Sequence, residues 1–378
     1  MRQPTQSRAP IEENKSGHRR TGSTEHAEQR ERYRPRVQRH APIFIQAMWR
    51  TGSTYLWKKF REQPKYRAYY EPLHHLLVKS RAENEAEHSA ALVASLRHPS
   101  VERFYFAELP FTVSEGVAFF EKPLSYERYC LEETEEDPAL HRYISYLIEF
   151  ASLHGQTAVL QFNRGLLRSG WLTRNFQPIN ILVLRRPANV WKSFLSFDSH
   201  SFTTLLTMVV GQNQHRAPLK YLPRWVEIPY QSGMRFEEDF AFYQPIAAAL
   251  EPELYPVFFD FYLLSTLHCA RYADCILDLD EISTNPRARR AATERLRDLG
   301  IRMDLEDCNL PRYALSDQEQ RAWVAQEEYA LTFLPHLLPL EHILPREIRT
   351  AHEGMLSEYF CNLLSRFALR QSELAACT

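Results

Sequence analysis

The feature that most constrains the fold of this chain is the stretch Pro42–Leu56, PIFIQAMWRTGSTYL. Residues 43–45 form an apolar run of the kind that builds a buried strand, and the pattern from 55 to 60 is typical of a helix. Between them lies a short loop that contains Gly52. The first N–H groups of such a helix have no intrahelical partner and lie at the positive end of its dipole. The stretch therefore predicts a strand, a loop and a helix that together bind an anion such as phosphate.

The loop itself supplies further groups for an anion. Arg50 adds a charge and a forked donor, Gly52 allows close backbone approach, and Ser53 and Thr54 add hydroxyl groups. The loop lacks the Gly-Lys-Ser/Thr ending of nucleotide-triphosphate loops, and a Gly-Ser-Thr turn before a helix is often only an N-cap. Residues 20–24 repeat the letters RTGST in a polar stretch with no apolar strand before it. The context, and not the pentapeptide, therefore carries the prediction.

Length and composition indicate a globular protein with a large core. The chain has 378 residues, of which 44% are hydrophobic, and its formal net charge is −1. This charge gives no general reason to expect nucleic acid or an anionic membrane as a partner. The six cysteines form no C-x-x-C pair, so we expect free thiols in a reducing, cytoplasmic location and no metal site. No apolar run is long enough to span a bilayer.

The sequence predicts two parts of unequal size. Residues 1–40 are polar and carry clustered arginines, which is typical of a disordered basic tail. Residues 41–378 are expected to form a single domain. Within that domain, residues 198–250 are interrupted repeatedly by proline. Such a segment indicates a lid or an acceptor-binding excursion, or else structural padding.

Predicted strands and helices alternate along this domain. Beyond the first unit, the strands expected from apolar runs are at 66–70, 158–162, 179–184 and 275–279. Helical periodicity is found at 164–176, 188–195, 258–272 and after Pro286. This alternation favours an α/β fold with a central parallel sheet flanked by helices. Residues 76–150 and 316–370 are predicted to be mostly helical, with the acidic run 132–137 on a solvated face.

Glu71 follows the second predicted strand, and Pro72 ends it. In open α/β sheets, ligand sites gather outside the carboxyl ends of the strands. Glu71 is therefore a candidate general base, with His74 as a second candidate. The alternative is that Glu71 pairs with a nearby cation and that His74 packs against a helix.

Arg185 ends the strand predicted at 179–184, and Ser193 lies eight residues later on the following helix. An arginine from a strand end and a serine about two turns into the next helix can converge on one phosphate. Pro187 is tolerated near the helix start. The alternative is an ordinary surface arginine with a solvent-facing serine.

Four motifs in the same order resemble those of the sulfotransferase superfamily. Residues 49–56, WRTGSTYL, resemble its 5′-phosphosulfate loop, and residues 184–193, LRRPANVWKS, resemble its 3′-phosphate motif. Residues 275–286, CILDLDEISTNP, are similar to a later strand and turn, and residues 70–73, YEPL, resemble the carbohydrate-type branch. The similarity covers roughly 41–300. Arg50 stands where the cytosolic animal branch has lysine, and a glycine-rich adenine loop is not visible.

The resemblance implies a P-loop-like fold and a metal-independent reaction. Those enzymes move a sulfuryl group from 3′-phosphoadenosine 5′-phosphosulfate (PAPS) to an acceptor hydroxyl. By this resemblance Glu71, with His74 in reserve, takes the acceptor proton, and Arg185 and Ser193 hold the 3′-phosphate. The loop residues implied in binding the phosphosulfate are Arg50, Thr51, Gly52, Ser53, Thr54 and Tyr55.

Two other function classes compete with this interpretation. A P-loop kinase would use the same strand, loop and helix, but the missing Lys-Ser/Thr opposes it. A non-catalytic binding protein that keeps the fold is the second, and the presence of all the motif residues opposes it. The Glu-Pro-Leu segment favours a sugar hydroxyl as acceptor, while a lipid, a peptide tyrosine or a small metabolite stay open. No sequence feature defines an oligomeric state.

Overall fold

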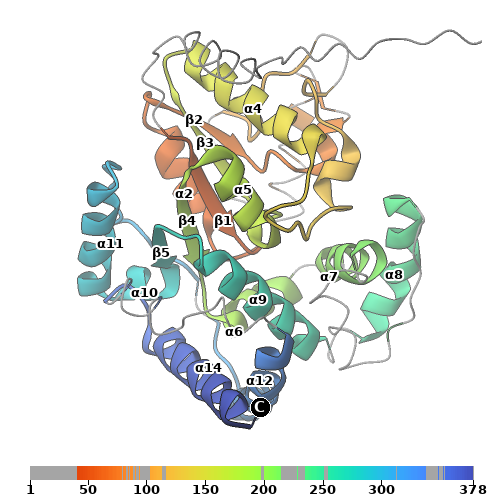
Figure 1. The fold of residues 1–378 in the computed structure, drawn as a ribbon, viewed down its shortest axis with the longest axis vertical. Coiled ribbons are helices and arrows are strands. Elements are labelled where there is room, and N and C mark those ends of the chain that lie inside the picture. The colour runs from red at the N-terminus through yellow and green to blue at the C-terminus, as the bar shows by residue number, and fades with distance from the viewer. Residues whose placement is uncertain are drawn as a thin grey trace, which may run out of the picture. The chain divides into compact units, whose positions relative to one another are not determined.

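A five-stranded sheet organises the computed structural model of the chain (Figure 1). The structure describes residues 41–78, 103–112, 116–196, 200–213, 235–250, 254–311, 313–337 and 354–377, with a few single residues between these ranges. All of them belong to one unit, His40–Thr378. The predicted tail, residues 1–40, and the centre of the 198–250 segment lie outside the described residues.

All five strands run parallel, in the order β2-β3-β1-β4-β5. The strands are β1 (Ile43–Ala47), β2 (Tyr66–Tyr70), β3 (Thr157–Phe162), β4 (Ile179–Leu184) and β5 (Cys275–Asp278). Nearly every strand residue is buried, as expected of a parallel sheet that is covered on both faces. The predicted α/β class with a central parallel sheet and flanking helices is therefore confirmed.

Helices follow the strands and cover the sheet (Figure 1). Those that connect or follow strands are α2 (Ser53–Arg61), α4 (Pro138–Leu153), α5 (Ser169–Phe176), α6 (Pro187–Leu195), α10 (Leu279–Thr284) and α11 (Pro286–Asp298). Local sequence explains where they begin and end. Asn285 caps α11 by accepting from the N–H of Arg287, with Pro286 at the first helical position, and Gly300 ends the segment with a φ of 79°.

A second helical layer surrounds α9 (Tyr255–Ala270), which is buried almost all round. It contacts α6, α12 (Asp317–Leu337) and the 3₁₀ turn η3 (Leu166–Arg168), and α12 in turn contacts α14 (Glu358–Cys377). The remaining elements are η1 (His75–Val78), η2 (Lys122–Ser125), α7 (His200–Leu206), the π-helical turn η4 (Thr207–Gln212) and α8 (Phe236–Leu250). The described ends of 198–250 are thus helical, and Pro245 lies inside α8.

Two predicted segments differ from the structure. The described residues between 103 and 137 are mostly turns and not helix, and the acidic run explains part of this. Glu135 accepts from the N–H of Glu132 at 2.7 Å, and Asp137 caps α4 by accepting from Leu140. These acids make a turn and a cap instead of a solvated helix face. In addition, residues 279–284 form α10 instead of extending the strand, because Asp278 caps that helix.

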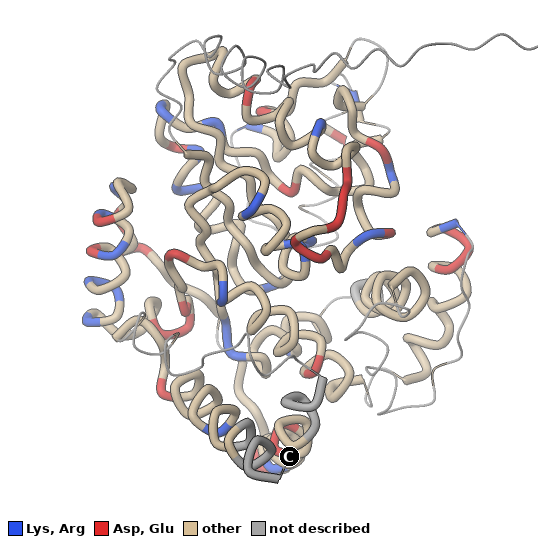
Figure 2. The backbone as a smooth tube through the Cα atoms, viewed as in Figure 1, with Lys and Arg blue, Asp and Glu red and all other residues tan. Residues whose placement is uncertain are grey.

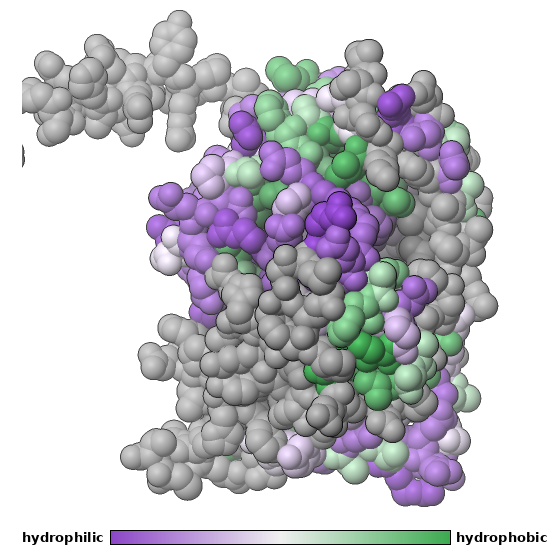
Figure 3. Space-filling view, turned by 90° about the vertical axis from the view of Figure 1, so that its right-hand side faces the viewer, coloured by the Kyte–Doolittle hydropathy of each residue, from purple (hydrophilic) through white to green (hydrophobic). Residues whose placement is uncertain are grey.

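Charges of both signs are interspersed along the described backbone, while hydrophilic and hydrophobic groups gather separately on one face. Figure 2 shows Lys/Arg and Asp/Glu positions interspersed, with both signs along α11. Figure 3, the side that lies at the right of Figure 1, shows separate hydrophilic and hydrophobic areas. Within the described ranges, no helix combines the length and apolar character that a bilayer crossing requires. Five of the described cysteines form no disulfide bond: Cys130, Cys269, Cys275, Cys308 and Cys361.

Candidate functional site

The strand register brings the predicted site residues to one edge of the sheet, which we call the carboxyl edge. Ala47 of β1 pairs with Val183 of β4, and Tyr70 of β2 pairs with Gln161 of β3. The chain leaves β1 towards β2 but leaves β4 towards β5, on the other side. Ligands bind at such switch points in open α/β sheets. The crevice between β1 and β4 is therefore the expected position of a ligand.

The loop after β1 depends on Gly52, which has a φ of 94° and directly precedes α2. The N–H of Tyr55 donates to the carbonyl of Gly52 at 2.9 Å, and the hydroxyl of Thr51 donates to the carbonyl of Met48 at 2.8 Å. A Cβ atom at position 52 would lie 2.9 Å from Leu279 Cδ1. The positive φ favours glycine here, and a side chain at this position would have to displace the end of Leu279.

The two arginine motifs meet at this loop. Arg50 Nε donates to the hydroxyl of Ser193 at 3.0 Å, across 143 residues of sequence. Arg185 Nη1 donates to the backbone carbonyl of Arg50 at 3.2 Å. We call these three residues, Arg50, Arg185 and Ser193, the cationic corner. The structure therefore brings together the residues that the sequence assigned to two phosphate groups.

Arg185 is held by several protein groups and is only 3% exposed. Its Nε donates to Asp280 at 3.3 Å, and Nη2 donates to the carbonyl of Pro311. Asp280 also accepts from the N–H of Arg186 at 3.0 Å and from Asn189 at 2.8 Å. A buried arginine of this kind requires such pairing, because an unpaired buried charge is costly.

Glu71 is also buried, at 5% exposure, and also paired. Its Oε1 accepts from Asn163 at 2.7 Å, and its Oε2 accepts from Arg164 at 2.7 Å. We call Glu71, Asn163 and Arg164 the carboxylate corner. The prediction that Glu71 ends its strand is confirmed, and the cation considered as its alternative partner is Arg164. A carboxylate has about four acceptor positions, so two remain for an incoming hydroxyl.

Hydrogen bonds connect the start of α2 with the carboxylate corner. Ser53 at the start of α2 donates to Asn163 Oδ1 at 3.2 Å and accepts from Gln161 Nε2 at 3.1 Å. Gln161 also donates to Asn163 at 2.8 Å and accepts from the N–H of Glu71 at 3.3 Å. The sequence analysis missed Gln161, Asn163 and Arg164. Their position at the end of β3 could have indicated them, because Arg185 has the same position at the end of β4.

The other predicted residues have different surroundings. Thr54 Oγ1 lies 3.4 Å from the hydroxyl of Tyr70, whose pKa is raised by burial and by the charge of Glu71. Tyr55 points its hydroxyl to Asp307 at 2.8 Å. His74 Nδ1 accepts from the N–H of Leu76 at 3.2 Å, and its ring stacks on that of His75 at 4.6 Å. This contact occupies one ring nitrogen of His74 and favours Glu71 as the base.

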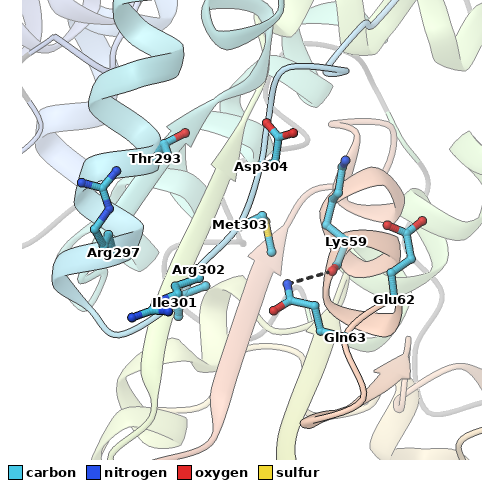
Figure 4. A pocket seen from close by; sticks show the side chains of 9 residues that line it. All are labelled: Lys59, Glu62, Gln63, Thr293, Arg297, Ile301, Arg302, Met303 and Asp304. Atoms are coloured by element: carbon cyan, nitrogen blue, oxygen red, sulfur yellow. Dashed lines mark hydrogen bonds between the residues drawn. The ribbon is translucent and has the colours of Figure 1, made fainter.

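A hollow of about 570 Å³ lies between α2 and α11, beside this site (Figure 4). Lys59 of α2 and the two residues just after the helix, Glu62 and Gln63, form one wall, and Thr293 and Arg297 of α11 form the other. The following segment, residues 301–304, also lines the hollow. None of the predicted site residues lines this hollow, so it is separate from the two corners.

Neither a metal-binding group nor a match to known proteins indicates the chemistry of the site. Among the described residues, no group of three or more His, Cys, Asp or Glu side chains is arranged to hold a metal ion. Comparisons with protein-family models, with curated proteins and with solved structures found no match to this chain. The chemistry available at the carboxyl edge therefore follows from its own groups: two adjacent arginines, the N–H groups at a helix start, and a buried carboxylate.

Proposed function

We propose that this protein is a sulfotransferase that moves a sulfuryl group from PAPS to an acceptor hydroxyl. The observation that carries the proposal is the cationic corner, where Arg50 bonds to Ser193 and Arg185 bonds to the carbonyl of Arg50. Two anion-binding elements, one from each strand at the switch point, are thereby adjacent. A donor with both a 3′-phosphate and a 5′-phosphosulfate has two anionic groups to fill them.

The donor groups in this proposal divide between the two elements. The N–H groups at the start of α2 and the side chain of Arg50 bind the 5′-phosphosulfate, where negative charge develops on the leaving oxygen. Arg185 and Ser193 bind the 3′-phosphate, which ATP lacks. The hydrogen bond between Arg50 and Ser193, at 3.0 Å, couples the two elements.

The reaction requires little covalent work from the protein. The acceptor oxygen forms a new bond to sulfur while the bond from sulfur to the 5′-phosphate oxygen breaks. The acceptor proton passes to Glu71, and the products are the sulfated acceptor and 3′,5′-adenosine bisphosphate. Asn163 and Arg164 hold the Glu71 carboxylate in one orientation, which favours an in-line approach.

Backbone strain at both corners supports a functional site. Arg50 has a φ of 67° and Glu71 a φ of 35°, although neither is glycine. A left-handed conformation costs a residue with a side chain about 1–2 kcal/mol. Such strain clusters at active sites, where the surrounding structure holds it in place. Here it occurs at the first predicted residue of each corner.

The test is calorimetric titration with 3′,5′-adenosine bisphosphate, with ATP and ADP as comparisons. We expect binding near micromolar, and a loss of about 10- to 100-fold in Arg185→Ala, because charged hydrogen bonds contribute about 1.5–3 kcal/mol. Arg186→Ala is the matched control, since its guanidinium lies 5.2 Å from the ring of Tyr359. Equal binding of ATP, or no binding, would contradict the proposal and favour a kinase or a non-catalytic protein.

Arg185→Ala also leaves Asp280 without its ion pair, which affects folding. A second variant, Ser193→Ala, removes one hydroxyl and keeps that pair. We expect it to weaken bisphosphate binding several-fold while the melting temperature stays close to that of the wild type. Unchanged affinity in Ser193→Ala would remove Ser193 from the 3′-phosphate site.

A further inference from the structure

A short segment crosses the candidate site, and we call it the strap: residues 304–311, DLEDCNLP. Leu310 places its two methyl groups 3.1 and 3.3 Å from where a Cβ on Gly52 would lie. The next residue, Pro311, accepts a hydrogen bond from Arg185 Nη2 through its carbonyl. The end of the strap therefore lies on both the glycine of the loop and the arginine of the cationic corner.

The strap is fastened at three places before it reaches the site, one of which is the ion pair of Glu306 with Arg289 of α11 at 2.8 Å. Leu305 and Cys308 are buried in the core, at 0% and 3% exposure. Asp307 accepts from the hydroxyl of Tyr55 at 2.8 Å and from Lys59 at 2.7 Å, so it ties the strap to α2. The side chain of Asp307 is 64% exposed, and exposed ion pairs of this kind are weak.

The guanidinium of Arg185 uses all three nitrogens on protein acceptors. Asp280 is buried beside it and also holds two neighbouring groups, so that pair is fixed. The carbonyl of Arg50 belongs to the loop itself. Pro311, in contrast, is exposed. Its carbonyl is the acceptor that an incoming phosphate can replace, because a charged oxygen is the stronger partner for arginine.

We propose that the strap is an autoinhibitory lid: it closes the anion site of the free protein and must withdraw Leu310 and Pro311 for an anion to reach Gly52 and Arg185. This inference rests on the proposed function for the identity of the ligand, but the competition concerns any phosphate at Arg185. The apparent affinity for the ligand is then reduced by the fraction of molecules that are closed. A variant that loosens the strap raises the affinity.

The test compares two loosened variants with a control on the same segment. Asp307→Ala removes the contacts to Tyr55 and Lys59, and Leu310→Ala removes methyl groups from the loop glycine. Asn309→Ala is the control, because Asn309 is an exposed residue of the same segment. We expect the affinity for 3′,5′-adenosine bisphosphate and for inorganic pyrophosphate to rise about two- to fivefold in the first two variants and to stay constant in the third.

Hydrogen exchange of the peptide that contains the strap gives a second readout. The N–H of Cys308 donates to the carbonyl of Leu305 at 3.0 Å in the closed state. Addition of the bisphosphate or pyrophosphate to the wild type should accelerate exchange in this peptide as the strap withdraws. Slower exchange on ligand addition, or unchanged or weaker affinity in both loosened variants, would overturn the proposal.

These outcomes separate the lid from the proposed function. Tighter pyrophosphate binding in the loosened variants, without preference for the bisphosphate over ATP, would retain the lid and reject the PAPS site. Preferred bisphosphate binding that the two variants leave unchanged would retain the PAPS site and reject the lid. If no anion binds to the wild type or to any variant, both proposals fail.

Discussion

The two corners of the carboxyl edge bury opposite charges and differ in what they have left to offer a ligand. In the cationic corner Arg185 donates to Asp280 and to the carbonyls of Arg50 and Pro311, so every nitrogen has a partner. In the carboxylate corner Glu71 accepts two hydrogen bonds and keeps further acceptor positions. The cationic corner must exchange a hydrogen-bond partner to bind a ligand, while the carboxylate corner only has to accept one more hydrogen bond.

This difference assigns binding to one corner and chemistry to the other. An arginine that exchanges a protein carbonyl for a phosphate oxygen makes a stronger hydrogen bond in the bound ground state. It therefore contributes to donor affinity. A carboxylate that accepts one proton during attack contributes in the transition state. Variants at the two corners should therefore separate: losses in affinity at the cationic corner, and losses in turnover at the carboxylate corner.

The largest effect is expected from Glu71→Gln. We predict a 100- to 10,000-fold loss of turnover, the range of general acid–base catalysis, with bisphosphate affinity within about twofold of the wild type. The measurement is bisphosphate release from PAPS with a panel of sugar, lipid, peptide and small-molecule hydroxyl acceptors. Full activity in Glu71→Gln would show that Glu71 is not the base and would leave His74 as the candidate.

Glu108→Gln is the matched control for this variant. Glu108 is likewise buried, at 6% exposure, and paired with an arginine, Arg61 at 3.0 Å, but it follows no strand end at the carboxyl edge. Removing either carboxylate leaves a buried arginine without its ion-pair partner, so both variants should lose stability. Only Glu71→Gln should lose turnover beyond what the lower fraction of folded protein explains.

Sequence patterns predicted where the residues of the cationic corner lie along the chain, for a physical reason. Apolar runs mark β1 and β4, and parallel strands align their carboxyl ends, so Arg50 and Arg185 follow buried strands and meet. The eight-residue separation of Arg185 and Ser193 then fixes a position about two turns along α6. Each of these steps depends only on local periodicity and on the alternation of strands and helices.

The carboxylate corner and the strap could be predicted only in part. Glu71 was found as the end of β2, but its partners Asn163 and Arg164 depend on β3 lying between β2 and β1, an order that periodicity does not contain. The positive φ of Glu71 has no sequence signal either. The strap carries no motif, and its position over Gly52 depends on the packing of Leu310 against the loop.

A second carboxylate near the cationic corner extends the comparison to pH. Asp278 ends β5 and accepts from the N–H of Ser357 at 3.0 Å and of Glu281 at 3.4 Å, without an arginine like that of Asp280. Burial raises the pKa of Asp278 from 3.8 to about 6. The folded state therefore holds this proton more tightly than the unfolded state, so this group favours folding below pH 4 and loses that contribution as the pH rises to 6.

We predict that Asp278→Asn becomes more stable relative to the wild type as the pH rises from 4 to 7. The expected change in the difference is up to about 3 kcal/mol, since one pKa unit corresponds to about 1.36 kcal/mol. Urea unfolding of both proteins at several pH values measures it. A difference that is constant across this range would mean that Asp278 titrates as an ordinary exposed carboxyl group does.

The smallest predicted effect concerns the connection between the anion loop and the carboxylate corner. Ser53 belongs to the anion loop and Asn163 holds Glu71, and their hydrogen bond of 3.2 Å joins the two. A double-mutant cycle of Ser53→Ala and Asn163→Ala should give a coupling free energy of about 1 kcal/mol in urea unfolding, the value of one buried hydrogen bond. Ser169→Ala, whose hydroxyl donates locally to Leu166, is the control partner for Ser53 and should show no coupling.

The same double-mutant cycle, measured by bisphosphate affinity, tests whether the hydrogen bond between Ser53 and Asn163 matters for function. If the loop and the carboxylate corner act together, Asn163→Ala weakens bisphosphate binding at the loop although Asn163 itself holds Glu71. This loss of affinity should disappear once Ser53 is already alanine. If stability couples but affinity does not, Ser53 and Asn163 only support the fold, and the loop binds its anion independently of the orientation of Glu71. The second outcome would mean that donor binding at the loop and proton transfer at the carboxylate corner are independent, because neither would then influence the other.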